Sequence, residues 1–548
     1  MLAAALVAAF GALLPGTVAR AQAGPPVCGP GGPPVTFAGT AMPADAKSYL
    51  ALEFAVAAGT TRVEATYAWT DRPGLPATPL TGTTFDLGLW DADGLGTPAG
   101  FRGWSGSRAG RPGQPVVFVQ PDAAARGYHP GPIEPGSWWV DLGIAALNVT
   151  GADWAVAVTC SAPPVGPPFV ADPVDPTHVA DADAGWYHGD FHMHGYHSHA
   201  NAPGWQELVD RARAEELDFL PITEYVTGQH WDELGPVQRA NPDVVLWPGR
   251  EIITYFGHAS ALGETRSVLE YRHGFPGVSL ADIQDRTLAD AALFQVNHPD
   301  TFAGPLFENL CRGCAFELGS VVDWDRVDTI EVLTGPVLAS SSELGLPGLP
   351  VMLENPFMQP AIERWEALLS AGFRITGVSG SDSKGVDAEP ERQGYGSSAT
   401  AVYAAQLSRP ALIEALRAGH AYIRTQGADE GPTLEFSATG PDGSVAMFGD
   451  TLAADTATFT ATVRGGVGQL LEITRDGELD GIPIPIQSDP FTYSWTGRRS
   501  LGSGPLGTFY RIDTRALLPA QASALTVRTT IGNPIFLAAA AAPSGPSA

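Results

Sequence analysis

Histidines gather in one part of this 548-residue chain, and their spacing is typical of a metal site. Ten of the twelve fall between His178 and His298, and the run 188–199 holds five of them. His192 and His194 are two residues apart, so on an extended strand both imidazoles point to one face. Two neutral imidazoles that converge from one side can begin a transition-metal site. The simpler alternative is a histidine-rich loop that binds metal adventitiously.

Four downstream motifs offer the other ligands that such a site needs, each where a strand is expected to end. They are Pro248-Gly-Arg-Glu251, Gly257-His258, Asn297-His298-Pro299 and Gly380-Ser-Asp382-Ser. In an α/β barrel, catalytic groups sit at the carboxyl ends of the strands. With His192 and His194 the set supplies four imidazoles and two carboxylates, enough for two divalent metals of the Zn, Mn or Fe type. Each motif alone is a weak signal, and their order and placement carry the prediction.

Changes in composition and in apolar periodicity along the chain indicate the domains that must position these groups. Residues 24–165 are rich in Gly, Pro, Thr and Val, with expected strands at 85–90, 115–119 and 137–142, and this pattern predicts a β-sandwich. Residues 166–185 form a proline-rich linker. Residues 430–538 predict a second β-domain, and the low-complexity tail 539–548 is expected to be disordered.

Between residues 186 and 425, apolar strands alternate with helical patterns, which predicts a barrel-like α/β domain. We expect a helix over 205–217, another over 362–369 that Gly372 ends, and strands at 217–223, 244–247, 293–296, 329–333 and 373–378.

Composition and charge exclude several classes of protein. Hydrophobic residues make up 44% of the chain and charged residues only 16%, which allows two or three folded domains. The net charge of −28 argues against nucleic acid or an anionic membrane as the main partner. Residues 1–23 resemble a signal peptide with an Ala21-Gln22-Ala23 cleavage site, and no later stretch approaches about 20 uninterrupted apolar residues. We therefore expect an exported protein, periplasmic or extracellular, without a stable membrane span.

The four cysteines agree with an oxidising compartment. Cys28 and Cys160 lie near the two ends of the expected N-terminal domain, so one disulfide between them is the natural prediction. Cys311-Arg-Gly-Cys314 is either a tight-loop disulfide or half of a zinc knuckle. The disulfide is favoured because the chain has no second Cys-x-x-Cys.

Taken together, residues 186 to about 425 resemble the PHP domain, a metal-dependent phosphoesterase fold. Within it the chain looks most like the exported CehA/McbA-type metallohydrolases. The matching segments are Trp186-Tyr-His-Gly-Asp-Phe-His-Met-His194, Leu217-Asp-Phe-Leu-Pro-Ile-Thr-Glu-Tyr225, Gly257-His-Ala-Ser-Ala-Leu-Gly263, Asn297-His-Pro, Ile330-Glu-Val and Gly377-Val-Ser-Gly-Ser-Asp382-Ser. With its flanking segments the resemblance covers nearly the whole mature chain. It implies a multidomain protein with a central distorted (β/α)7 barrel between N-terminal and C-terminal β-sandwiches.

The resemblance also implies two metal positions that share one carboxylate. The first metal would be held by His192, His194, Glu251 and Asp382, and the second by Glu251, His258 and His298. Asp190 is expected to orient a ligand from outside the coordination shell.

The chain departs from the family pattern where a third metal would bind. It has Thr223-Glu-Tyr225 in place of Thr-Asp-His, and Asp382-Ser-Lys384 in place of Asp-x-His. We therefore expect two metals, or one, rather than three. Lys384, one of only two lysines, is either a solvated surface residue or an ammonium that replaces the third metal's charge and binds a substrate anion. Tyr225 would donate to the same oxygen or simply pack, and His199 would bind a metal or act as general acid.

Three functions are consistent with these residues. The first is hydrolysis of a small phosphoester, or of a carbamate or carboxylic ester, by a metal-activated water. The second is an amidohydrolase, but neither Lys47 nor Lys384 is placed to bridge two metals as a carboxylated lysine. The third is a catalytically degenerate barrel that serves as an exported binding protein.

Overall fold

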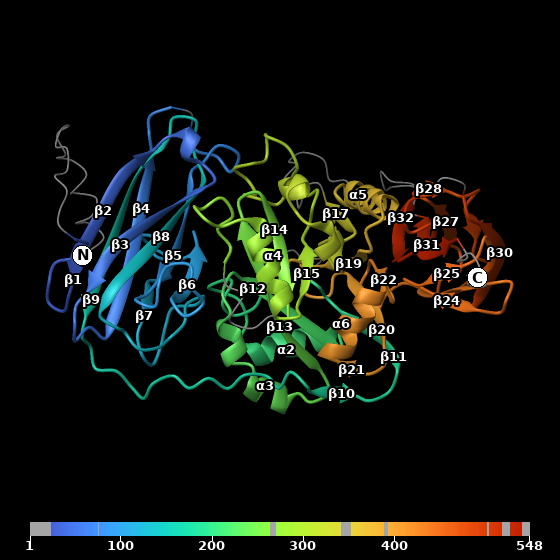
Figure 1. Cartoon of the computed structure of the whole chain (residues 1–548), viewed down its shortest axis with the longest axis horizontal. Helices are drawn as coiled ribbons and strands as arrows, with labels where there is room; N and C mark the ends of the chain where they lie inside the picture. The colour runs from blue at the N-terminus through green and yellow to red at the C-terminus, as the bar shows by residue number, and fades with distance from the viewer. Residues whose placement is uncertain are drawn as a thin grey trace, which may run out of the picture. The chain divides into compact units, whose positions relative to one another are not determined.

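The computed structural model describes residues 24–74, 76–263, 270–340, 352–387, 393–500, 503–517 and 526–539. The expected signal peptide and residues 540–548 of the expected disordered tail lie outside these ranges. The chain divides after Val170 into two compact units, and each is described by itself (Figure 1). Over the described ranges, no helix combines the length and the apolar character that a membrane crossing requires.

The first unit contains two β-sheets that share one hydrophobic core. One sheet has the strand order β1-β3-β8-β5-β6 and the other β2-β9-β4-β7. Their strands are β1 (Val27–Cys28), β2 (Val35–Ala41), β3 (Ser48–Val56), β4 (Arg62–Asp71), β5 (Thr84–Trp90), β6 (Phe101–Gly106), β7 (Val117–Val119), β8 (Gly136–Ala146) and β9 (Ala152–Ser161), and a 3-10 turn spans Pro43–Asp45. Side chains from both sheets, such as Val140 and Val156, belong to one buried cluster. The predicted Cys28–Cys160 disulfide is present at the edge of this core.

The second unit is built on one long mixed sheet with helices around its first part. The order of the site-bearing strands is β19-β16-β15-β14-β13-β12-β11-β20-β22. These are β11 (Gly185–Gly189), β12 (Phe219–Tyr225), β13 (Val245–Thr254), β14 (Gly257–Leu262), β15 (Leu293–Val296), β16 (Thr329–Thr334), β19 (Thr376–Gly380), β20 (Ala399–Ala404) and β22 (Ala421–Arg424). Short strands outside it are β10 (Val179–Asp181), β17 (Leu338–Ser340), β18 (Met352–Glu354) and β21 (Leu407–Ser408).

The helices agree with the apolar periodicity of the sequence. They are α2 (Trp205–Ala214), α3 (Gly235–Ala240), α4 (Leu280–Ala289), α5 (Met358–Ala371) and α6 (Arg409–Ala418), with 3-10 turns at Gln229–Asp232, Glu317–Ser320 and Trp324–Arg326. In α5 the residues Ile362, Trp365 and Leu369 recur at the helical period and are all buried. Gly372 ends this helix in the left-handed conformation, as the sequence predicts.

The sheet does not close into a barrel by a continuous ladder in the part of the chain that the structure describes. At its open side, the segment after β11 approaches the end of β19 and the residues that follow it through three backbone hydrogen bonds. These are Phe191 N–H to Ser379 O at 3.1 Å, Asp382 N–H to His192 O at 2.7 Å and His194 N–H to Ser383 O at 2.9 Å. A regular ladder ends here because Asp382 adopts a left-handed φ of +50°, which extended strands do not allow. The described strands therefore form an open sheet with an irregular seam at this side, and the expected distorted barrel is not closed by strand pairing within the described residues.

The C-terminal β segment continues this sheet. Its strands are β23 (Thr433–Thr439), β24 (Val445–Met447), β25 (Thr451–Ala453), β26 (Thr456–Arg464), β27 (Leu470–Arg475), β28 (Glu478–Leu479), β29 (Ile484–Pro485), β30 (Phe491–Arg498), β31 (Thr508–Leu517), β32 (Thr526–Gly532) and β33 (Ile535–Ala538). Strand β32 pairs with β22, while β24-β23-β26-β30 form a separate sheet over a shared core. The Asn533 amide then bonds the backbone N–H of Gly377 at 2.8 Å and the carbonyls of Gly377 and Ala421, both at 3.0 Å. The C-terminal segment is thus hydrogen-bonded to β19, the strand that leads to Asp382.

Candidate metal centre

The six predicted metal ligands come together from five places along the second unit. Glu251 lies in β13, His258 in β14, and the others follow the ends of β11, β15 and β19. In the β13–β14 hairpin, Ile253 pairs with His258, so Glu251 and His258 are diagonal neighbours on one face. All six residues are buried except Asp382, whose side chain is 28% exposed. The centre therefore lies mostly away from water, with Asp382 at its open side.

Glu251 is the middle of the cluster. Its Oε1 lies 3.0 Å from His258 Nδ1, 3.2 Å from His298 Nε2 and 3.5 Å from His192 Nε2. Its Oε2 lies 3.5 Å from His194 Nε2. One carboxylate thus faces all four imidazoles, which is the position that a bridging ligand needs.

Two imidazoles have their outer nitrogen fixed by a backbone carbonyl. His298 Nδ1 lies 2.9 Å from the carbonyl oxygen of Cys314, and His258 Nε2 lies 3.1 Å from that of Arg312. A carbonyl oxygen can only accept, so both of these ring nitrogens carry a proton. In the neutral imidazole the opposite nitrogen is then unprotonated and carries a lone pair. In both residues that nitrogen faces Glu251.

The outer nitrogens of the other two imidazoles are fixed by side chains. Ser198 Oγ donates its only proton to Glu224, so it accepts from His194 Nδ1 at 3.2 Å. His192 Nδ1 lies 3.2 Å from Glu331 Oε2. In the neutral form both rings therefore present Nε2 to the centre, and outer partners of this kind are a regular feature of metal-binding histidines.

Several ligand atoms that face one another in the centre are hydrogen-bond acceptors, and this arrangement is unfavourable unless a cation lies among them. His194 Nε2 is 3.0 Å from Asp382 Oδ1, and burial lowers the pKa of His194 to about 4. The pKa of Asp382 lies well below its ordinary value, because the charges of Lys384 and His192 outweigh the effect of burial, which would raise it. At neutral pH this contact joins two acceptors. Among the described residues, His192 Nε2 and Glu251 Oε2 have no hydrogen-bond partner and are buried. A divalent cation would satisfy these atoms.

The chemistry of the donors fits metals of the Zn, Mn or Fe type. Ligand atoms of His192, His194 and Asp382 lie within 4.8 Å of one another, as do those of His192, Glu251 and His298. A mixture of imidazoles and carboxylates suits these metals better than Mg or Ca, which favour oxygen alone. His298 and Asp382 have φ angles of +28° and +50°. Non-glycine residues rarely adopt such angles, and they concentrate at functional sites.

Glu331 is a site residue to which the sequence analysis gave no role. It is fully buried in β16, and its Oε2 accepts from His192 Nδ1 and from the backbone N–H of His298 at 2.8 Å. The signal available in the sequence was Ile330-Glu-Val, a carboxylate between apolar residues of a strand.

Asp190 also supports the site as expected, because it accepts from the backbone N–H groups of His192, Ser381 and Gly396.

The three expected catalytic residues have different surroundings. The Tyr225 ring stacks on His194 with centroids 4.1 Å apart, at the end of β12. Lys384 Nζ lies 2.8 Å from Asp382 Oδ1 and 5.6 Å from the centre of the Tyr225 ring. His199 lies in the adjoining turn, where its Nδ1 accepts from the backbone N–H of Asn201 at 3.1 Å. The place expected for a third metal thus holds a lysine ammonium beside the phenol ring.

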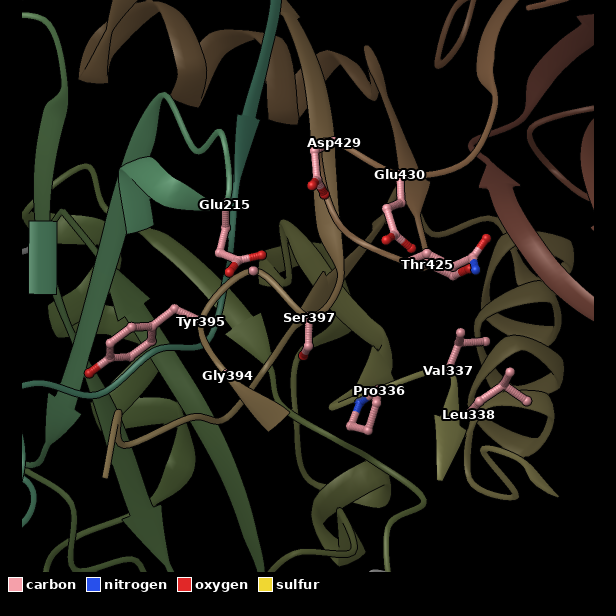
Figure 2. Close-up of a pocket in the computed structure, with 12 residues that line it drawn as sticks. Glu215, Pro336, Val337, Leu338, Gly394, Tyr395, Ser397, Thr425, Asp429 and Glu430 are labelled. Atoms are coloured by element: carbon pink, nitrogen blue, oxygen red, sulfur yellow. The ribbon is translucent and has the colours of Figure 1, made fainter. Parts of the chain in front are cut away.

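A cavity of about 420 Å³ lies beside residues 394–397, the segment that contacts the backbone of His194 through Tyr395. Glu215, Asp429 and Glu430 line it, together with the 394–397 segment (Figure 2). Tyr395 belongs to this wall and donates its hydroxyl to the carbonyl of His194 at 2.7 Å. None of the six predicted metal ligands lines the cavity, so it is not the chemical centre.

Comparison with known proteins gives little beyond this geometry. No protein-family model matches the sequence. No curated protein matches it. Among solved structures, the chain is similar to a two-domain protein from Bacteroides vulgatus ATCC 8482 that contains a predicted PHP-like metal-dependent phosphoesterase, with 17% identity and a TM-score of 0.34. The match covers 66% of this chain and 98% of that chain, and a TM-score this low carries no argument about activity.

Proposed function

We propose that the protein is an exported metal-dependent hydrolase that cleaves a small ester. The observation that carries the proposal is the convergence of four imidazole nitrogens on Glu251 and Asp382. Within the described part of the chain, His192 Nε2 and Glu251 Oε2 are buried without a hydrogen-bond partner. Such an arrangement is costly without a metal cation or a bound proton, because carboxylate oxygens and the lone pairs of neutral imidazoles face one another in a buried site.

The proposed ligand assignment is the one that the family resemblance implies, and the position of Glu251 among the four imidazoles supports it. His192, His194, Glu251 and Asp382 would hold the first metal, and Glu251, His258 and His298 the second. When bound, divalent metals of this kind supply a water nucleophile at neutral pH and polarise the electrophilic centre. The protein's own part is to fix the imidazoles through their outer hydrogen bonds and to keep the centre largely away from bulk water.

The residues at the open side would bind the substrate. The Lys384 ammonium lies beside Asp382, where it can attract a negatively charged oxygen of a phosphoester. Tyr225 offers a phenol next to the same place, and His199 would donate a proton to the leaving group. A carbamate or carboxylic ester is the neutral alternative.

The finer architecture is part of the same proposal. Residues 186–425 would be a PHP-type (β/α)7 barrel with an irregular seam, of the CehA/McbA type. The β-sandwich modules 24–165 and 430–538 would flank it, with 166–185 as the linker and residues 1–23 directing export.

A second candidate function is that of an exported binding protein. It is favoured by Tyr225 and Lys384, which replace the imidazoles of a third metal position and leave a lysine in contact with Asp382. An amidohydrolase with a bridging lysine gains no support, since Lys384 Nζ contacts Asp382 rather than Glu251.

The test is turnover by the full chain after metal loading and after chelation. Bis-p-nitrophenyl phosphate, a p-nitrophenyl ester and 1-naphthyl methylcarbamate represent the three substrate classes. We expect at least one to be cleaved by the loaded protein, and the rate to vanish with the chelator and with Glu251→Gln. Stoichiometric metal without turnover of any of the three would favour the binding protein.

A further inference from the structure

The loop Cys311–Cys314 contacts both histidines of the proposed second metal position. It provides the carbonyls of Arg312 and Cys314 that accept from His258 Nε2 and His298 Nδ1. These two bonds decide which nitrogen of each ring faces Glu251. The loop is therefore part of the construction of the metal centre rather than a remote surface turn.

The backbone of the loop is shaped for this close approach. Gly313 has φ +95°, and a Cβ at this position would lie 2.3 Å from the carbonyl oxygen of Thr254 and 3.1 Å from His258 Nε2. Only glycine fits such a contact without moving the loop. The packing brings the residue that follows Gly313 next to the imidazoles.

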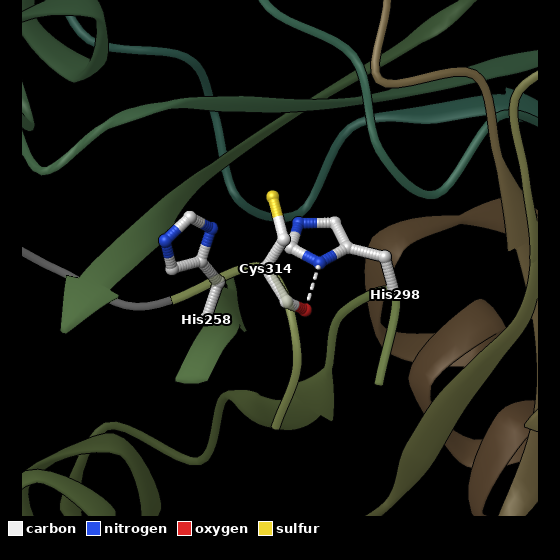
Figure 3. A group of neighbouring side chains, drawn as sticks. All are labelled: His258, His298 and Cys314. Atoms are coloured by element: carbon white, nitrogen blue, oxygen red, sulfur yellow. Dashed lines mark hydrogen bonds between the residues drawn. The ribbon is translucent and has the colours of Figure 1, made fainter. Parts of the chain in front are cut away.

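That residue, Cys314, places a sulfur atom among possible metal ligands. Ligand atoms of His258, His298 and Cys314 lie within 4.8 Å of one another. Figure 3 shows the sulfur between the two rings, while the carbonyl of the same residue bonds His298 Nδ1. Cys314 is 7% exposed and is joined to Cys311, which is half-buried. The proposed hydrolysis makes no use of this sulfur.

We propose that Cys314 is a redox-controlled ligand of the second metal, an inference that rests on the proposed metal centre. In the Cys311–Cys314 disulfide the sulfur has no thiolate charge and is a poor ligand, so the second metal is held by His258, His298 and Glu251. After reduction the Cys314 thiolate joins these three donors.

The reduction step balances with an external dithiol. One of its thiolates attacks the more exposed sulfur, that of Cys311, and the disulfide bond breaks with Cys314 leaving as a thiolate. The second thiol of the reductant then attacks the mixed disulfide and releases Cys311 as a thiol. The protein disulfide gains two electrons, and the dithiol is oxidised to a disulfide.

Reduction would change both the preferred metal and the activity. Two imidazoles, a carboxylate and a thiolate make four donors that suit zinc, whereas the oxidised set of imidazoles and carboxylate accepts manganese and iron equally well. Structural zinc sites are closed by four protein ligands, while catalytic sites keep one position open. The reduced centre would therefore retain zinc more firmly and turn over substrate more slowly.

Cobalt(II) is a suitable probe, because a thiolate ligand gives it a charge-transfer absorption that imidazoles and carboxylates do not. The full chain would be titrated as the oxidised protein and as Cys311→Ser and Cys314→Ser, each of which lacks the disulfide. Only Cys311→Ser keeps a thiol at position 314. We expect the charge-transfer band in Cys311→Ser and its absence in the other two proteins.

A missing band in Cys311→Ser, or an equal band in Cys314→Ser, would overturn the proposal. If cobalt still gives ligand-field bands there, the metal centre stands without the redox step. If no form binds cobalt, the proposed metal centre fails as well. Should Cys311→Ser not fold, the wild type reduced by a phosphine replaces it, with alkylation mapping to show that Cys28 and Cys160 remain joined; the same band is expected.

Discussion

Glu331 fixes the ring of His192 from the side opposite to Glu251. Its Oε2 lies 3.2 Å from His192 Nδ1, while the inner nitrogen Nε2 lies 3.5 Å from Glu251 and has no hydrogen-bond partner in the ranges that the structure describes. The same oxygen accepts from the backbone N–H of His298. One buried carboxylate thus contacts two of the proposed ligands, through the ring of His192 and the backbone of His298.

Glu331→Gln should therefore weaken metal binding without removing a ligand. Loss of a carboxylate behind a ligating histidine typically costs about 10- to 100-fold in metal affinity. Calorimetric titration with zinc would measure the shift, and saturating zinc should restore the wild-type stoichiometry. An unchanged affinity would contradict this positioning role.

Glu251→Gln should have a larger effect, because the amide carries no charge and its nitrogen cannot coordinate. We expect the loss of at least one metal per chain, measured by elemental mass spectrometry after dialysis. Glu478→Gln is a matched control, since Glu478 is exposed in β28. Equal metal content in the two variants would refute the bridging role of Glu251.

Lys384→Ala should raise KM for an anionic phosphodiester more than for a neutral carbamate. A charged hydrogen bond contributes about 1.5–3 kcal/mol, which corresponds to about a 10- to 100-fold change. Lys47→Ala is the natural control, because Lys47 is the other lysine and belongs to the first unit. Equal changes in KM for both substrates would count against anion binding by Lys384.

Metal affinity should fall as pH decreases. Burial alone would lower the pKa of His192, but the carboxylates of Glu331 and Glu251 raise it well above its usual value. In the metal-free protein His192 therefore holds a proton more firmly than an ordinary imidazole does, and a metal must displace that proton. Below the raised pKa we expect the zinc Kd to rise about tenfold for each pH unit lost. Calorimetry in buffers of different ionisation enthalpy would count the protons released; no release would contradict this expectation.

The sequence alone predicted much of the site, because its signals are local. His192 and His194 lie two residues apart, Glu251 lies in a recognisable strand, and His298 and Asp382 follow two others. Glu331 was missed because a single carboxylate in an apolar strand does not reveal which face it occupies. Its role depends on contacts with residues 139 and 33 positions away along the chain.

The seam of the sheet and the C-terminal continuation could not be predicted for a similar reason. The seam depends on the left-handed backbone at Asp382, a conformation that an aspartate adopts only where its surroundings impose it. The continuation depends on the pairing of Tyr422 with Gly532, two residues far apart in sequence. Strand periodicity indicates that β22 and β32 are strands, but it does not indicate that they are partners.

The pairing of β22 with β32, together with Asn533, restricts how this protein could have been assembled from modules. A chain that stopped near residue 430 would expose the unpaired edge of β22 and remove three hydrogen bonds to Gly377 and Ala421. Exposed edges of this kind favour aggregation. We therefore expect the two parts to fold and to be produced only as a single piece, whereas the first unit has a core of its own.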